Sequence, residues 1–243
     1  MAAFEGLWPP AGGRRGTTIA GCVLTDAEID HTNGLLQLRE GCPFRIYSTA
    51  TVHHWLSEYL PFESVLSDFA DRSWTNLALN DQIELPLPDG QGSGLHVRAF
   101  EGGGEGPRFV PEGVGLLSES VVGLHIEDAT SGGTLVYAPG VLTINESLTE
   151  SARQADCVLM DGTFWQDDEP IRMGITDRTS LEMGHTPVDG PNGSLDWLAG
   201  LPTKHRAYIH VNNTNPMLND RGPEQRRVLE HGAHVCCDGN EFE

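Results

Sequence analysis

Four side chains that can bind a metal ion follow one another within a single short segment, Asp26-Ala-Glu28-Ile-Asp30-His31. The apolar run of residues 19–24 before them predicts a buried strand, and residues 32–40 after them predict a short helix. Ligands between the carboxyl end of a strand and a helix lie where open α/β sheets usually carry their sites. The segment is therefore either a metal or catalytic site or a solvated acidic turn, since charge runs usually face water.

Two later predicted strands also end in a residue that can bind a metal ion. Residues 157–160 lead into Asp161, and residues 207–209 lead into His210. Carboxylates and imidazoles that recur at strand ends are harder to explain as chance than one acidic turn. The sequence therefore favours a metal or catalytic centre that involves Asp30, His31 and His210.

The composition narrows the class of protein. The chain has 243 residues, 38% of them hydrophobic, and a formal net charge of −20, which makes a nucleic-acid partner unexpected. We find no run near the ~18 apolar residues of a membrane span. Residues 1–16 lack the apolar core of a signal peptide, so we expect a cytoplasmic protein. The five cysteines form no C-x-x-C pair and are expected to be reduced.

The predicted elements must bring these strand ends together. Early elements are a strand over 44–48 and a helix over 51–59 capped by Thr49. A β-rich middle follows, with strands over 75–79, 82–85, 95–100, 121–126 and 134–137 and a hairpin turn at 130–133. Helices over 146–155, 194–200 and 223–230 then alternate with strands, the last over 233–236. Between the sets, the Gly-rich residues 102–115 predict a mobile loop, and the whole order predicts a layered α/β sandwich.

Several separate blocks, in order, resemble one protein family. The blocks are Leu24-Thr-Asp-Ala-Glu-Ile-Asp-His-Thr-Asn-Gly-Leu-Leu36, Gly133-Thr-Leu-Val-Tyr-Ala-Pro-Gly140, Asp161-Gly-Thr-Phe-Trp165, Met183-Gly-His185 and Ile209-His-Val-Asn-Asn-Thr-Asn-Pro-Met217. They are similar to the pyrroloquinoline quinone (PQQ) biosynthesis protein B family from about Thr18 to the C-terminus. The segment from Asp26 to His31 resembles the H-x-H-x-D-H motif of the metallo-β-lactamase superfamily, with carboxylates in place of the first two histidines.

The resemblance implies a fold and an activity. The fold would be a metallo-β-lactamase-like αββα sandwich over residues 18–243, with a mobile Gly-rich loop at about 101–115. The middle of the chain, residues 102–120, resembles the family least. In the family the activity is understood as iron-dependent hydroxylation of the tyrosine ring in a Glu-Tyr unit, and an older proposal is transport of PQQ or its precursor toward the periplasm. Carried over by motif, one iron(II) would be held by Asp30, His31 and His210.

The residue types agree with that ligand set. A dinuclear zinc hydrolase of the superfamily uses both histidines of H-x-H for its first metal, and this chain has Asp26 and Glu28 there. Exchanging imidazole for carboxylate weakens a zinc site and favours harder ions. Two histidines and one aspartate form the facial triad of non-haem iron(II) oxygenases, which leaves open positions for dioxygen and substrate. We therefore expect an oxygenase rather than a hydrolase.

Several neighbours of the triad keep two interpretations. Asp26 and Glu28 are either catalytic proton acceptors or groups that orient the histidines. Asp161 corresponds to the bridging carboxylate of the dinuclear enzymes and is either a weak ligand or a supporting group. Three further candidates could support the site or bind substrate: His185, Trp165 and Asn212. The ordinary alternatives are a hydrogen-bonded structural histidine for His185, core packing for Trp165 and a stabilised turn for Asn212.

The chain also departs from the family pattern. Family members usually begin with several tens of residues that contain the first strands and a cysteine cluster binding a structural zinc, so that zinc is not expected here. Residues 1–17 are expected to be a poorly ordered remnant, and a missing strand would expose a sheet edge that allows self-association. The expected partner is a small-molecule or dipeptide precursor of PQQ. A non-catalytic carrier and an inactive truncated homologue remain as alternatives.

Overall fold

Two β-sheets packed face to face form the centre of the molecule. The computed structural model describes residues 19–38, 44–69 and 72–242. The smaller sheet is parallel and contains, in spatial order, β1 (Gly21–Val23), β2 (Phe44–Ser48) and β3 (Arg72–Asn76). The larger sheet has, within the described residues, seven strands in the order β10, β9, β8, β7, β6, β5, β4.

The larger sheet changes from antiparallel to parallel pairing at β7. An antiparallel meander comprises β4 (Gln82–Pro86), β5 (Gly92–Glu101), β6 (Val122–Asp128) and β7 (Thr134–Ala138). Parallel strands continue with β8 (Cys157–Asp161), β9 (His205–Ile209) and β10 (His234–Val235). Because β8 and β9 are parallel neighbours, Asp161 lies opposite Ile209, next to His210.

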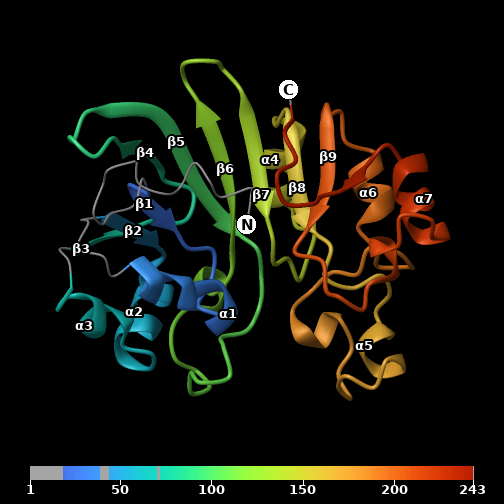
Figure 1. Ribbon diagram of the computed structural model, residues 1–243, viewed down its shortest axis with the longest axis horizontal. Helices are drawn as coiled ribbons and strands as arrows, with labels where there is room; N and C mark the ends of the chain where they lie inside the picture. Colours follow the sequence, from blue (N-terminus) through green and yellow to red (C-terminus); the bar gives the residue numbers. More distant parts are fainter. Residues whose placement is uncertain (1–18, 39–43, 70–71, 243) are drawn as a thin grey trace, which may run out of the picture.

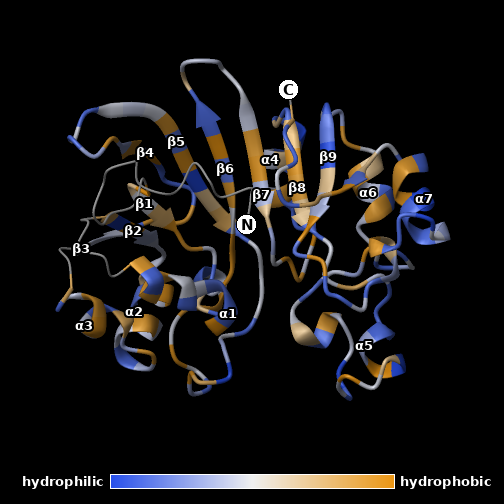
Figure 2. Cartoon of the chain, viewed as in Figure 1, coloured by the Kyte–Doolittle hydropathy of each residue, from blue (hydrophilic) through white to orange (hydrophobic). Residues whose placement is uncertain are grey.

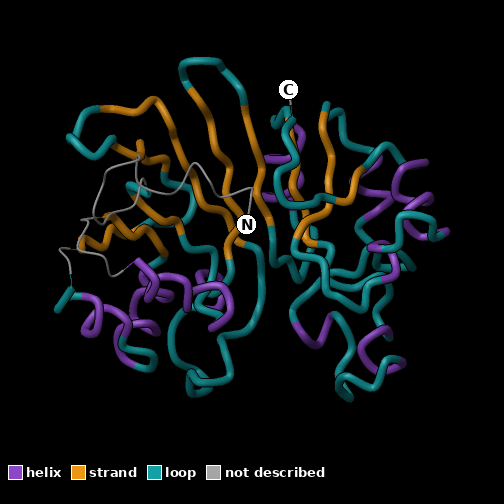
Figure 3. Tube along the Cα trace, viewed as in Figure 1, coloured by secondary structure: helices purple, strands orange, loops and turns teal. Residues whose placement is uncertain are grey.

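Helices cover the outer faces of both sheets, which gives four layers (Figure 1). Beside the smaller sheet lie α2 (Ala50–Glu58) and α3 (Phe62–Leu66). Beside the larger sheet lie α4 (Glu146–Arg153), α6 (Leu195–Ala199) and α7 (Pro223–Glu230). The short helices α1 (Ile29–Thr32) and α5 (Glu169–Arg172) flank the long loops that extend beyond the strand ends (Figure 3).

Three groups of buried apolar side chains hold these layers together. One joins α2 and α3 to the smaller sheet, and it includes Trp55, Leu56 and Ile46. A second joins the two sheets, where Val23 of β1 packs against a cluster that contains Leu124 of β6. The third joins the larger sheet to α4, α6 and α7. Figure 2 shows the corresponding concentration of apolar residues along the strands. The predicted metallo-β-lactamase-like sandwich is confirmed.

Local sequence signals fix several of these elements. Thr49 caps α2 by accepting a hydrogen bond from the Val52 backbone N–H, and Asn145 caps α4 by accepting one from Leu148. The predicted hairpin at 130–133 joins β6 to β7. These features follow from side chains that bond to backbone close by in the sequence, so the pattern alone predicts them.

The helix predicted over residues 32–40 is wrong in its start and type. It begins earlier as α1, and a 3-10 helix, Asn33–Leu38, follows. The Glu28 carbonyl accepts hydrogen bonds from the backbone N–H of His31 and Thr32 and from the Thr32 hydroxyl, which starts the helix before the predicted cap. Asp30 and His31 therefore lie on the helix itself. Residues 39 and 40 lie outside the described residues.

The Gly-rich segment has the irregular backbone that the sequence predicts. Between Gly102 and Leu116 the structure contains no helix or strand. The segment is fastened to α2, because the Trp55 indole N–H donates to the Val114 carbonyl at 3.1 Å and the Leu116 N–H donates to the Thr51 hydroxyl at 3.1 Å. Its mobility stays a prediction.

Two further expectations concern the start of the chain and membranes. The predicted remnant over residues 1–17 lies outside the described residues, so an exposed edge beside β1 stays a prediction. Among the described helices, none has the length and apolar character to cross a membrane.

Candidate metal centre

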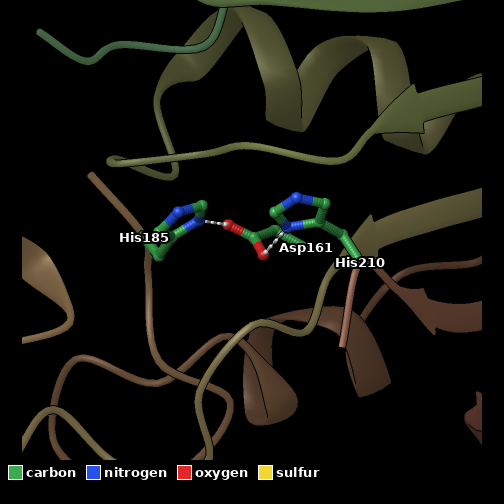
Figure 4. Close-up of side chains that lie close together, drawn as sticks. All are labelled: Asp161, His185 and His210. Carbon is green, nitrogen blue, oxygen red and sulfur yellow. Dashed lines mark hydrogen bonds and ion pairs between the residues drawn. The ribbon is translucent and has the colours of Figure 1, made fainter. Parts of the chain in front are cut away.

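Imidazole and carboxylate groups converge where the strands of both sheets end. Asp26 follows β1, and His31 lies on α1. From the larger sheet come Asp161, the last residue of β8, and His210, which follows β9. His185 enters from the loop after a 3-10 helix, Leu181–Met183, and Figure 4 shows it on the other side of Asp161 from His210.

His31 is oriented by a buried carboxylate. Its Nδ1 lies 2.7 Å from Oδ1 of Asp26, whose side chain also accepts hydrogen bonds from the Glu28 N–H and the Thr25 hydroxyl. Burial by itself raises the pKa of Asp26, but the hydrogen bond and charge of His31 and the other donors outweigh it and lower the pKa. Asp26 in turn raises the pKa of His31. With Nδ1 donating to Asp26, the neutral His31 ring carries its lone pair on Nε2.

His210 is oriented in a similar way, through Thr163. The Thr163 hydroxyl donates its only hydrogen to Oδ1 of Asp161 at 2.6 Å, so it accepts from Nδ1 of His210 at 2.8 Å. His210 has a left-handed backbone, with φ of 54°. Such a conformation is unusual for a residue with a Cβ and often marks a functional site. The neutral His210 ring therefore also carries its lone pair on Nε2.

The two Nε2 atoms point at each other. They lie 2.8 Å apart, and the rings meet edge to face with centroids 4.9 Å apart. If both rings are neutral with Nδ1 protonated, two lone pairs oppose each other, and only a proton or a cation between them relieves the contact. Two imidazole nitrogens about 2.1 Å from a shared metal, at right angles, would be about 3 Å apart. This pair therefore fits a metal ion.

Asp161 and His185 form a second ion pair beside His210. The side chain of Asp161 is fully buried. Its Oδ2 lies 2.7 Å from Nδ1 of His185 and accepts a hydrogen bond from the Val141 N–H. Its Oδ1 accepts from the Thr163 N–H and hydroxyl. Burial raises the pKa of Asp161, but His185 and the other donors outweigh it and lower the pKa to about 2. Both oxygens of this carboxylate are thus engaged within the protein.

Two sets of ligands are consistent with these positions. In the described chain, one ligand atom each from Asp161, His185 and His210 lie within 4.8 Å of one another. The other set is the sequence-derived triad, in which Oδ2 of Asp30 lies 3.9 Å from Nε2 of His31. The side chain of Asp30 is 84% exposed, whereas Asp161 already accepts four hydrogen bonds. Asp30 is therefore the carboxylate that can turn toward a metal without breaking internal bonds.

Glu28 lies at the cavity and differs from Asp26 in the direction of its pKa shift. It lines the same cavity as His31, and burial together with the charges of Asp26 and Asp30 raises its pKa. A raised pKa brings a carboxylate closer to the range in which it can both take and release a proton. Asp26, by contrast, is hydrogen-bonded to His31 and has a lowered pKa.

The other two candidates lie outside the cavity lining. Trp165 packs in the hydrophobic core between the larger sheet and its helices, where its indole cannot stack on a bound ligand. Asn212 lies in the turn after His210 and donates from its side chain to the Thr214 hydroxyl and from its backbone to the Thr163 carbonyl. Asn212 therefore supports the loop that carries His210.

Thr163 is a site residue that the sequence did not reveal. Its hydroxyl contacts Asp161, His210 and His185, and it thereby links the Asp161–His185 ion pair to His210. The available signal was its place two residues after Asp161, inside a block shared with the resembling family. The conformation of His210 carried no signal at all, because left-handed backbone is typical of glycine or asparagine rather than histidine.

The centre opens into a cavity of about 730 Å³. Its lining includes His31, His185 and His210, together with residues of α1, the Gly-rich segment and the loop before His185. A cavity of this volume is within the range that holds a small organic ligand. The candidate metal centre therefore adjoins a cavity with room for a small ligand.

The sequence is similar to a group of curated proteins. The beta-lactamase superfamily domain matches residues 3–211. Coenzyme PQQ synthesis protein B of Pseudomonas syringae pv. tomato is 38% identical over 245 residues, which cover 100% of this chain and 80% of the relative. The protein of the same name from Ectopseudomonas mendocina is 40% identical over 242 residues, covering 98% and 78%. The first alignment includes residues before Thr18, so the similarity begins earlier than the sequence blocks indicated.

Solved structures are similar as well. The crystal structure of Zn²⁺-bound PqqB from Methylobacterium extorquens has a TM-score of 0.83 and 34% sequence identity, and the match covers 97% of this chain and 76% of that one. Unliganded yeast PDE1 has a TM-score of 0.59 at 12% identity, with 91% and 67% covered. The yeast structure shares the fold alone.

Proposed function

The chain belongs to the coenzyme PQQ synthesis protein B family, within the β-lactamase superfamily, and from this premise we propose that it hydroxylates the tyrosine ring of a Glu-Tyr precursor of PQQ. A role in PQQ synthesis follows from the family. The ring hydroxylation and the use of iron(II) are the finer part of the proposal.

The observation that carries the proposal is the pair of Nε2 atoms of His31 and His210, 2.8 Å apart with exposed Asp30 beside them. Two imidazoles and one carboxylate are the donor set of non-haem iron(II) oxygenases. A first zinc site of the hydrolase kind is disfavoured, because Asp26 is buried and bonded to His31. The Zn²⁺-bound relative supports a divalent metal in this family.

When bound, iron(II) would supply the activation of dioxygen that ring hydroxylation requires. One oxygen atom enters the ring and the other leaves as water, so a two-electron reductant must also be present. The protein positions the precursor in the 730 Å³ cavity, with its ring toward His31 and His210. Asp26 and Thr163 keep the lone pairs of these two rings directed at the metal position.

Glu28 is the group proposed to move a proton. Hydroxylation of a ring carbon ends with loss of the proton from that carbon, and a base beside the ring promotes this step. The raised pKa of Glu28 suits a carboxylate that accepts this proton and later releases it to water. Asp26 acts as a positioning residue.

The test is incorporation of labelled oxygen. The chain is loaded anaerobically with iron(II), mixed with Glu-Tyr and ascorbate, and exposed to ¹⁸O₂; the proposal expects ¹⁸O in the tyrosine ring by mass spectrometry. His210→Ala should abolish incorporation, whereas His54→Ala, which changes an exposed histidine on α2, should retain it. Tight binding of PQQ without any incorporation would overturn the proposal and favour a carrier. Neither binding nor incorporation would favour an inactive homologue.

A further inference from the structure

Two arginines line the cavity that opens over the metal centre. Arg108 comes from the Gly-rich segment, and Arg178 comes from the loop that ends at His185. The chain has only 15 lysines and arginines against 35 acidic residues, so two guanidinium groups at one cavity are a local exception to its charge. The same cavity is lined by acidic side chains, among them Glu28, Asp30 and Glu182.

Both guanidinium groups are available to a ligand. Within the described residues, Arg108 is exposed and its side chain has no hydrogen bond or ion pair. Arg178 is half-buried, and its ion pair in the described chain joins its Nη2 to Oε2 of Glu105 over 3.8 Å. The side chain of Glu105 is 82% exposed, and such surface pairs contribute little to stability. A ligand carboxylate can therefore replace Glu105 at small cost.

The backbone that carries each arginine is held in place. Gly106, two residues before Arg108, lies so close to the Trp55 ring that a Cβ there would be 3.0 Å from it, and Phe109 packs against the same apolar cluster. On the other side, the Ser180 hydroxyl donates to the His185 carbonyl at 2.8 Å, which ties the Arg178 loop to the centre. Both arginines thus line the cavity from segments whose backbone is anchored.

We propose that Arg108 and Arg178 bind two carboxylates of the substrate and so select an aromatic dicarboxylate for this cavity. Guanidinium groups bind carboxylates through paired hydrogen bonds, and half-buried Phe109 adds an apolar side chain to the lining of the same cavity. Without these cations, the acidic lining would repel such a ligand. The inference rests on the proposed function for its choice of ligand, since Glu-Tyr carries two carboxylates and one aromatic ring.

Binding to the metal-free chain tests this inference separately from catalysis. Glu-Tyr, its C-terminal amide, Gln-Tyr and PQQ are titrated into the EDTA-treated full chain by calorimetry. Arg108→Gln and Arg178→Gln should each weaken Glu-Tyr binding about tenfold or more, because each removes a charge-assisted contact. When the carboxylate bound by one arginine is replaced by an amide in the ligand, substitution of that arginine should weaken binding no further. Arg178→Lys should recover part of the affinity, since charge is kept but the paired geometry is lost.

The matched control is Arg172→Gln, which removes an exposed arginine paired with Asp168 outside the cavity and should leave binding unchanged. Circular dichroism establishes that each variant is folded. The inference is overturned if the parent binds none of the four ligands, or if both cavity variants bind Glu-Tyr like the parent. Arginine-dependent binding without ¹⁸O incorporation would leave the inference standing and sink the hydroxylation. If the arginine variants keep the parent's KM and full ¹⁸O incorporation, the inference is overturned and the hydroxylation stands.

Discussion

Replacing Asp26 by asparagine tests whether this carboxylate acts on the metal centre through His31. Asparagine has the same shape, and its side-chain oxygen can still accept from Nδ1 of His31 and from the Glu28 N–H. Its amide NH₂ would face the Thr25 hydroxyl, which can rotate to accept a hydrogen bond. The substitution therefore removes the negative charge while every bond in the network can be remade.

The expected effect on metal affinity is large and depends on pH. Carboxylate partners of histidine ligands are worth about 10–100-fold in metal affinity, or about 1.4–2.7 kcal/mol. Asp26 also raises the pKa of His31, so in the parent chain a proton competes with the metal at low pH. In Asp26→Asn this pKa falls back toward its ordinary value. The loss of metal affinity in Asp26→Asn, relative to the parent chain, should therefore reach the full range of about 10–100-fold at pH 8 and be smaller at pH 6.

Competition titrations against a chromophoric chelator measure this directly, with Co²⁺ in air and iron(II) under argon. Asp81→Asn, an exposed carboxylate in the turn between β3 and β4, is the control and should match the parent at both pH values. Equal affinity of Asp26→Asn and the parent at pH 8 would refute the reasoning. A deficit that grows as the pH falls would refute the argument about the proton.

Three other predictions concern the surroundings of the centre. The pKa of Asp161 is lowered from 3.8 to about 2, so the ionised carboxylate stabilises the folded state above about pH 4 and this stabilisation is lost as the pH falls to about 2. In urea unfolding of the metal-free chain, the free energy of unfolding should fall by about 2 kcal/mol over this pH range. In Asp161→Asn this pH-dependent loss should be absent. Thr163→Val removes the acceptor for Nδ1 of His210 and should lower metal affinity about tenfold. It also removes the hydroxyl that donates to buried Asp161, so Tm should fall as well, whereas Thr163→Ser should restore both. Gly123→Ala would place a Cβ 2.2 Å from the Phe100 ring and should reduce the free energy of unfolding by about 1–3 kcal/mol, measured in urea; an unchanged midpoint would contradict the packing.

Sequence patterns predicted the elements whose causes are local. The caps at Thr49 and Asn145 and the hairpin between β6 and β7 depend on residues only a few positions apart, and the structure confirms them. The start of α1 was misjudged because the Glu28 carbonyl, a backbone group common to every residue, accepts the hydrogen bonds that begin it. The residue types in the sequence therefore do not indicate where this helix begins.

The site was predicted less completely than the fold, for a physical reason. His31 and His210 are 179 positions apart; their places at strand ends grouped them in one predicted centre, and the motif resemblance then assigned them as ligands. The hydrogen bonds of Thr163 depend on the register between β8 and β9 and on the left-handed turn at His210, both of which are tertiary features. For Trp165 the sequence left substrate stacking and core packing open, and the structure shows the side chain in the core, the commoner position for an aromatic residue.

The position of the metal is the central claim, and anomalous diffraction tests it most directly. Crystals grown with iron(II) under argon are measured above and below the iron absorption edge. The account predicts one anomalous peak within bonding distance of Nε2 of both His31 and His210, with the Asp30 carboxylate turned toward it. A peak held instead by Asp161 and His185, or no peak in crystals that contain stoichiometric iron, would contradict it.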